Sequence, residues 1–182
     1  GGFFFQPPAA DRGVAAAGRG GDAQQLLSEI EEVDRALEAA TTPEQKAAHH
    51  ARRADLLEEI AAGASSGSDR AMWLRQLADM VSAAVQAGEY PDGAERLQAL
   101  VAKLSGNEGD RDLAAYVKFR QLAAEYGQRM QTAGGEAEEM AKVQDEWLDA
   151  LKQYVDDYPK SPDAAEAMLQ IGISEEFAGK ED

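Results

Sequence analysis

Apolar side chains recur at three- and four-residue steps along most of the chain. An example of this spacing is the segment before residue 159, with Trp147, Leu151, Tyr154 and Tyr158. Such spacing places side chains on one side of an α-helix, whereas a half-buried strand alternates apolar and polar residues. No long segment shows that alternation. The pattern therefore predicts an all-α protein.

Helix-capping residues and glycines divide the chain into predicted antiparallel hairpins. Asp22 is expected to cap the first helix. The segment from Thr42 to Gln45 has a proline at its second position and forms a capping box for a second helix, which stops at Gly63. Because the connection is short, the two helices are expected to pack as an N-terminal helical hairpin over residues 22–63.

Further helical hairpins are expected over residues 68–182. Ser68 follows a linker of small residues and is the expected cap of the next helix. A turn over residues 90–93 leads into a shorter helix that closes at Gly106. Asp110 is expected to cap a long helix.

Two glycines and a proline-marked turn punctuate the last third of the chain. Gly134 and Gly135 should break the long helix, and the next helix starts at Glu136. Ser161 should cap a last helix with Pro162 in its first turn. The apolar positions expected on the buried side of this last helix are Ala165, Met168, Leu169 and Ile171.

The segment from Asp145 to Asp182 resembles a junction between two tetratricopeptide repeats. The residues that carry the resemblance are Ala150, Tyr154, Pro162, the pair Ile171-Gly172, and Gly179. They match a small residue, an aromatic, the proline that ends a repeat, an aliphatic-glycine pair, and a helix stop. Asp157 and Glu175 depart from the pattern. The resemblance implies stacked hairpins in an α-α superhelical array with a groove that docks a partner.

Two further resemblances concern the origin of the chain. The Tyr-Pro-x-Ser-Pro sequence at residues 158–162 is similar to repeats in bacterial cell-envelope proteins. The run from Asp69 to Gly93 resembles the helical region that precedes the thioredoxin-like domain in thiol-disulfide reductases of the TlpA type. Together they imply a fragment of a periplasmic or otherwise extracytoplasmic protein. Any catalytic, thioredoxin-like domain would then lie downstream of residue 182.

The chain is strongly acidic, with a net charge of −16 over 182 residues and a pI near 4.5. Such a field repels nucleic-acid phosphates and attracts cationic partners, although the same acidity can serve solubility alone. The absence of cysteine excludes disulfides, thiolate nucleophiles and cysteine metal sites. No apolar run has the roughly 18 residues that a membrane helix needs.

The residues that could take part in catalysis or metal binding do not have the spacing of an active site or a metal site. Adjacent helical residues diverge by about 100°, so His49 and His50 cannot chelate one ion as an i, i+4 pair could. The acidic turn at residues 107–112 lacks the spacing of a calcium loop. The glycines of residues 1–21, a predicted flexible leader, lack the flanking elements of a phosphate loop. We expect no catalytic residue, cofactor or metal, and a protein that is not an enzyme.

Aromatic side chains are the candidates for contact with a protein or peptide partner, which the charge suggests is cationic. They are Tyr116, Phe119, Tyr126, Trp147 and Tyr154. At helical spacing the same residues also fit a structural core. An enzyme would require a deep pocket that holds His49 or a buried pair of carboxylates. Two non-catalytic functions stay open besides. One is a non-catalytic interaction module with a docking groove, and the other is a structural spacer with none.

Overall fold

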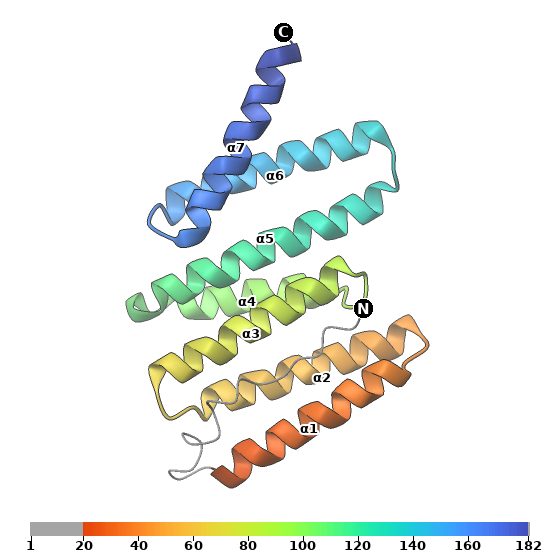
Figure 1. Cartoon of the computed structure of the whole chain (residues 1–182), viewed down its shortest axis with the longest axis vertical. Helices are drawn as coiled ribbons and strands as arrows, with labels where there is room; N and C mark the ends of the chain where they lie inside the picture. The colour runs from red at the N-terminus through yellow and green to blue at the C-terminus, as the bar shows by residue number, and fades with distance from the viewer. Residues whose placement is uncertain (1–19, 182) are drawn as a thin grey trace. The chain divides into compact units, whose positions relative to one another are not determined.

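A computed structural model describes residues 20–181, with side chains from Asp22 to Gly179. These residues form helices and connecting turns and no strand, so the all-α prediction is confirmed for them (Figure 1). The elements are α1 (Gly20–Ala39), α2 (Pro43–Ala62), α3 (Gly67–Gln86), α4 (Gly93–Ser105), the 3-10 turn η2 (Glu108–Asp110), α5 (Arg111–Ala133), α6 (Ala137–Asp157) and α7 (Pro162–Glu181).

The start of α1 differs from the prediction. Residues 1–19 of the predicted leader lie outside the described residues, but Gly20 and Gly21 already belong to α1. Asp22 therefore lies in the first turn of α1 and not at its cap. A carboxylate at that position still interacts favourably with the positive end of the helix dipole.

The chain divides into two compact units, one through Leu77 and one from Ala78. The division falls inside α3. The first unit contains α1, α2 and the start of α3, and the second contains the rest of α3 with α4 to α7. The predicted hairpin of residues 22–63 belongs to the first unit, as does the linker at 63–67 where the sequence predicts a boundary.

In the first unit, α1 and α2 pack as an antiparallel hairpin (Figure 1). The Gln45 amide N–H donates to the Thr42 hydroxyl over 3.2 Å, and the Thr42 N–H donates to the Gln45 side chain. The predicted capping box is thus confirmed. Buried Arg53 crosses between the helices and donates from Nε to Asp34 over 2.8 Å. Gly63 is the C-cap of α2, as predicted.

The cap of α3 is Ser66 and not Ser68 as the sequence suggested. The Asp69 amide N–H donates to the Ser66 hydroxyl over 3.1 Å, and α3 already begins at Gly67. Serines occur at 65, 66 and 68 around the start of the helix, and the pattern of apolar positions further along the helix does not show which of them is the cap. Only the backbone geometry of the first turn decides which hydroxyl meets an unpaired N–H.

We expect Ser66→Ala to lower the free energy of unfolding by about 1 kcal/mol, because it removes a helix cap. Ser68→Ala, the matched control two residues on, should stay within about 0.5 kcal/mol. Urea unfolding followed by circular dichroism measures both. If Ser68→Ala were the more damaging substitution, the assignment of the cap would be wrong.

The second unit pairs α4 with α5 and α5 with α6. Gly88, with φ 76°, ends α3 in a left-handed conformation that favours glycine. Gly134 and Gly135 likewise have positive φ and separate α5 from α6, which confirms the predicted break. Asp110 precedes α5 as expected but makes no capping hydrogen bond. The side chain of Asn107 caps η2 instead, accepting from the Gly109 N–H.

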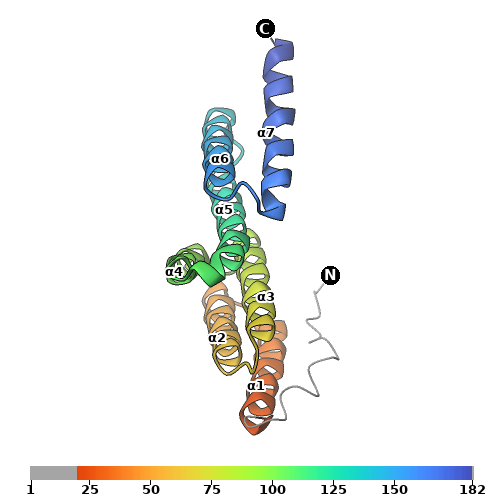
Figure 2. The same ribbon diagram turned by 90° about the vertical axis from the view of Figure 1, so that its left-hand side faces the viewer.

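Helix α7 packs on α6 and, at its start, on α5. The predicted Ser161 cap is confirmed, because its hydroxyl accepts from the Asp163 N–H over 3.1 Å. The buried side is formed by Ala164 and Ala167, not by the predicted Ala165, Met168 and Leu169, which are exposed. Gly179 does not end the helix, which continues to Glu181. In Figures 1 and 2 the C-terminal half of α7 projects past α6.

Candidate functional site

Four of the five predicted aromatic residues meet between α5 and α6. Tyr126 and Trp147 stack with ring centroids 4.8 Å apart. Phe119 lies 6.5 Å from Trp147 and 5.4 Å from Tyr154. The Trp147 indole N–H also donates to Gln170 of α7 over 3.1 Å. These contacts join three helices and make the aromatic cluster part of the packing of the second unit.

Tyr154 is the most enclosed member of this cluster, with 2 % of its surface exposed. Its hydroxyl donates to the backbone oxygen of Ala115 over 2.8 Å and lies 2.7 Å from the Ser161 hydroxyl. One side chain therefore links α5, α6 and the cap of α7. With so little surface exposed, Tyr154 serves the core and presents no face to a partner.

Tyr116, the fifth predicted residue, lies apart from the cluster on the side of α5 that faces α3. Its hydroxyl donates to both carboxylate oxygens of Asp79, at 2.8 and 2.9 Å. The guanidinium of Arg120 lies 3.7 Å above its ring and also donates to Asp79. Arg120 donates in addition to Asp163 of α7 over 2.7 Å. These charge-assisted bonds tie α3, α5 and α7 together within the second unit.

The sequence singled out neither Arg120 nor its two carboxylates. Arg120 follows Tyr116 by four residues, and this spacing in the sequence predicts that the two side chains are neighbours on one side of the helix. Asp79 and Asp163 lie 41 and 43 residues away, however, and helical periodicity does not tell which distant carboxylates a cation meets.

Burial raises the pKa of Tyr154 from 10.0 to about 12. Burial and the hydrogen bond to Asp79 raise the pKa of Tyr116 from 10.0 to about 12 as well. Folding therefore favours the neutral phenols over the phenolates. Their contribution to stability is fully present below pH 10 and is lost as the pH rises towards 12.

We expect the melting temperature of the protein to fall between pH 10 and pH 12 more steeply than that of the double variant Tyr116→Phe/Tyr154→Phe, which lacks both titrating groups. Thermal unfolding followed by circular dichroism across this range measures the difference. Parallel curves for the two proteins would show that neither tyrosine resists ionisation in the fold.

A groove of about 470 Å³ lies between α3 and α5 beside Arg120. Asp79, Ser82, Gln86 and Phe119 contribute to its walls. Most of these polar groups already pair with one another. Gln86 donates to the Ser82 hydroxyl over 3.0 Å, and that hydroxyl donates to the backbone oxygen of Arg120 over 2.9 Å. Little hydrogen-bonding capacity remains for a ligand here.

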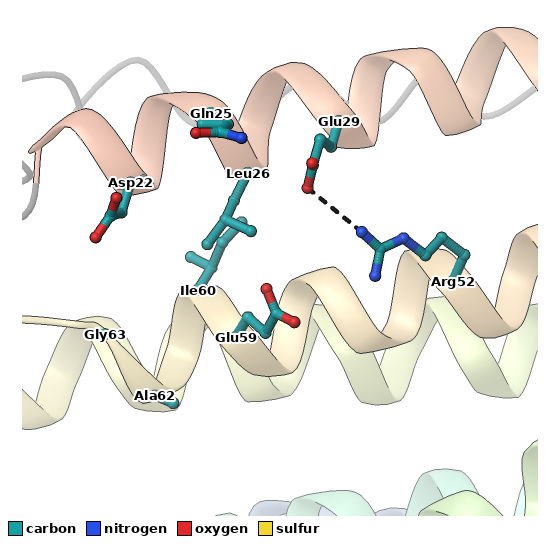
Figure 3. A pocket seen from close by; sticks show the side chains of 10 residues that line it. Asp22, Gln25, Leu26, Glu29, Arg52, Glu59, Ile60, Ala62 and Gly63 are labelled. Carbon is teal, nitrogen blue, oxygen red and sulfur yellow. Dashed lines mark hydrogen bonds and ion pairs between the residues drawn. The ribbon is translucent and has the colours of Figure 1, made fainter.

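A second groove, of about 530 Å³, lies between α1 and α2 in the first unit (Figure 3). We call it the acidic groove. Leu26 and Ile60 approach each other from the two helices and provide apolar surface. Its charged lining residues are Asp22, Glu29, Glu59 and Arg52.

The carboxylates of the acidic groove outnumber its cation. Arg52 pairs with Glu29 over 3.5 Å, the contact drawn as a dashed line in Figure 3. Asp22 and Glu59 are exposed and make no ion pair with any other described side chain. Among the described residues, two carboxylates beside apolar surface therefore have no cationic partner. The aromatic residues of the sequence give no indication of this groove, because none of them lines it.

Among the described side chains, no group of three or more His, Asp or Glu residues is placed to hold a metal ion. His49 and His50 are partly buried in α2. The acidic turn at 107–112 is occupied by its own contacts, including a bond from the Asn107 amide to Asp110.

Comparison with known proteins places the chain in no family. No family model, no curated protein and no solved structure matches it. Within residues 20–181, none of the helices combines the length and apolar character required to cross a membrane.

Proposed function

We propose that this chain is a non-catalytic helical interaction module whose acidic groove binds a protein or peptide segment that carries lysine or arginine. The observation that carries the proposal is the combination of Leu26 and Ile60 with the carboxylates of Asp22 and Glu59, which make no ion pair with another described side chain. The aliphatic stem of a lysine or arginine can lie on the apolar surface while its charged end meets a carboxylate. The net charge of −16 should also speed encounter with a cation.

Within the same proposal, the helical hairpins stack in a tetratricopeptide-like array. Support comes from the second unit, where buried Tyr154 belongs to the core cluster that includes Ala164 and Ala167 of α7, partly buried Ala150 packs against that cluster, and Pro162 opens α7. A bacterial cell-envelope protein, periplasmic or otherwise extracytoplasmic, is the proposed origin. Any redox activity would reside in a downstream thioredoxin-like domain. A Cys-x-x-Cys in a βαβ pattern downstream of residue 182 would support this origin, and a downstream sequence without one would oppose it.

The alternative function is a structural spacer without a working groove. The aromatic cluster favours it, because Trp147 and Tyr154 hold three helices together instead of lining an open surface. A spacer would carry its acidity for solubility alone. The two functions differ in one measurable respect, since only the interaction module binds a cationic segment with a preference for the acidic groove.

The test is a titration of the full chain with unstructured synthetic peptides of equal length. In one, lysine alternates with serine, and in the controls glutamine or glutamate replaces lysine. We expect binding of the lysine peptide alone. Its affinity should fall as salt rises, because the Debye length shrinks from about 30 Å at 0.01 M to about 8 Å at 0.15 M. Equal binding of the glutamine peptide, or no binding at low salt by the folded protein, would favour the spacer.

Charge reversal separates the groove from the general field of the protein. Glu59→Lys changes an exposed carboxylate of the acidic groove, and Glu32→Lys makes the same change at an exposed position of α1 outside it. We expect Glu59→Lys to weaken the lysine peptide about fivefold to tenfold, which corresponds to roughly 1 kcal/mol for a surface charge contact. Equal losses in both variants would mean that net charge alone drives binding.

A further inference from the structure

An exposed apolar stripe runs along α7. Leu169, Ile173 and Phe177 are 58 %, 46 % and 68 % exposed. Their spacing of four residues places them on one side of the helix, and Ala164 and Ala167 are buried on the other. Among the described residues, the large hydrophobic side chains recorded as exposed are these three and Met168, all on α7. A run of this kind on one helix marks a surface that interacts with a partner.

Acidic side chains share the side of α7 that carries this stripe. Glu166 precedes Leu169 by three residues, and Glu176 follows Ile173 by three, so both lie on the side of the helix that carries the stripe. Both are exposed. Glu175, one residue before Glu176, lies 4.0 Å from Lys152 of α6. The α7 stripe, defined as Leu169, Ile173 and Phe177 with Glu166 and Glu176, is therefore apolar and negatively charged at once.

We propose that the α7 stripe docks an amphipathic helix whose apolar side is flanked by lysine or arginine. The apolar side chains of the α7 stripe recur every four residues, and this spacing suits a partner helix that lies along α7. Amphipathic helices are commonly recognised through apolar side chains at such steps. Glu166 and Glu176 supply the complementary charge that fixes the choice of partner. This surface belongs to the second unit and does not depend on the acidic groove of the first.

Two other occupants fit the charges less well. A second copy of the chain would bring together two molecules that each carry a net charge of −16, and such self-repulsion keeps proteins monomeric. An anionic membrane surface attracts basic segments and would repel the glutamates beside the stripe. A basic helix gains from the same glutamates that oppose these alternatives.

The probe is a synthetic amphipathic peptide with leucines at i, i+3, i+4 and i+7 steps and lysines on the flanks. A matched peptide keeps the leucines and replaces every lysine by glutamate. Fluorescence anisotropy of labelled peptide gives its affinity for the full chain, and circular dichroism reports helix formation on binding. We expect the lysine peptide to bind at least about tenfold more tightly than the glutamate peptide. Equal affinities would overturn the proposed charge preference.

Substitutions within α7 locate the contact. Leu169→Ser and Ile173→Ser should each weaken binding of the lysine peptide about tenfold or more, because each removes an aliphatic side chain that the bound peptide would bury. Met168→Ser is the matched control. It removes an equally exposed side chain that points about 100° away from Leu169, and it should leave the affinity unchanged. All of these positions are exposed, so the variants should fold. A loss confined to Met168→Ser, or no loss in any variant, would overturn the assignment.

Charge variants and the state of assembly complete the test. Glu166→Lys/Glu176→Lys should weaken binding of the lysine peptide, whereas Glu138→Lys/Glu139→Lys, the same change at exposed positions of α6, should not.

Analytical ultracentrifugation should find that the protein is a monomer, and vesicles with anionic lipid should not bind it. Self-association or vesicle binding that Leu169→Ser abolishes would assign the stripe to those occupants instead. Glu59→Lys should leave this peptide's affinity unchanged, which keeps a failure here distinct from a failure of the acidic groove.

Discussion

Replacing Tyr154 by alanine is expected to lower the free energy of unfolding by about 3 to 5 kcal/mol, the usual cost of removing a large buried aromatic side chain. Tyr154 is 2 % exposed and packs against Phe119 and Tyr158. Its loss would open a cavity where α5, α6 and the start of α7 meet. Chemical unfolding of the variant and the wild-type protein measures the difference.

Two further substitutions separate the parts of this effect. Tyr154→Phe keeps the ring and removes only the hydroxyl bonds to Ala115 and Ser161, so it should cost about 1 kcal/mol. Phe177→Ala also removes an aromatic ring, but from a side chain that is 68 % exposed, and should stay within about 0.5 kcal/mol. Comparable losses for Tyr154→Ala and Phe177→Ala would contradict the described core.

Gly93→Ala is expected to destabilise the protein by about 1 to 3 kcal/mol through overpacking. A Cβ atom at this position would lie 2.5 Å from Val85 Cγ2, 2.9 Å from Val81 Cγ1 and 3.0 Å from Tyr90 Cδ2. Both valines are buried, and β-branched side chains have few alternative rotamers. The start of α4 must therefore move away from α3.

The control for this prediction is Gly172→Ala. Gly172 lies inside α7, and a Cβ atom there would meet nothing within 4 Å. Alanine favours the helical state, so this variant should be more stable than the wild-type protein by about 0.5 to 1 kcal/mol. Melting temperatures that shift in opposite directions are the expected result. A neutral Gly93→Ala would mean that α3 and α4 are not packed as closely as described.

The helices could be predicted from the sequence because their ends are set by local interactions. The capping box at Thr42, the stop at Gly63 and the break at Gly134 depend on residues a few positions apart. Errors arose where several local choices were equivalent. Ser66 and Ser68 are both suitable caps, and a single glycine such as Gly179 is tolerated within a helix.

The buried side of α7 could not be predicted because both of its sides carry apolar residues. Larger side chains such as Met168 and Leu169 outweigh Ala164 and Ala167 in any count of hydrophobicity. The choice between the two sides is made by close packing against α5 and α6, where small residues permit a short distance between helices. Sequence periodicity contains no information about that distance.

The candidate sites were harder to predict than the helices, since each depends on residues brought together by packing. Aromatic content pointed to Trp147 and Tyr154, and these proved to lie in the core cluster or against it. The acidic groove joins Leu26 of α1 to Ile60 of α2 across a hairpin. The overall acidity did predict the kind of partner that we propose, but not the place where it would bind.

The most direct test of the proposed function is to map where the lysine–serine peptide contacts the protein. Amide chemical shifts of the isotope-labelled full chain, recorded during titration at low salt, report this for each residue. We expect the largest changes at residues 22–29 of α1 and 52–63 of α2, and we expect Glu59→Lys to abolish them. Changes spread evenly over all acidic helices, or confined to residues after Ala78, would contradict it.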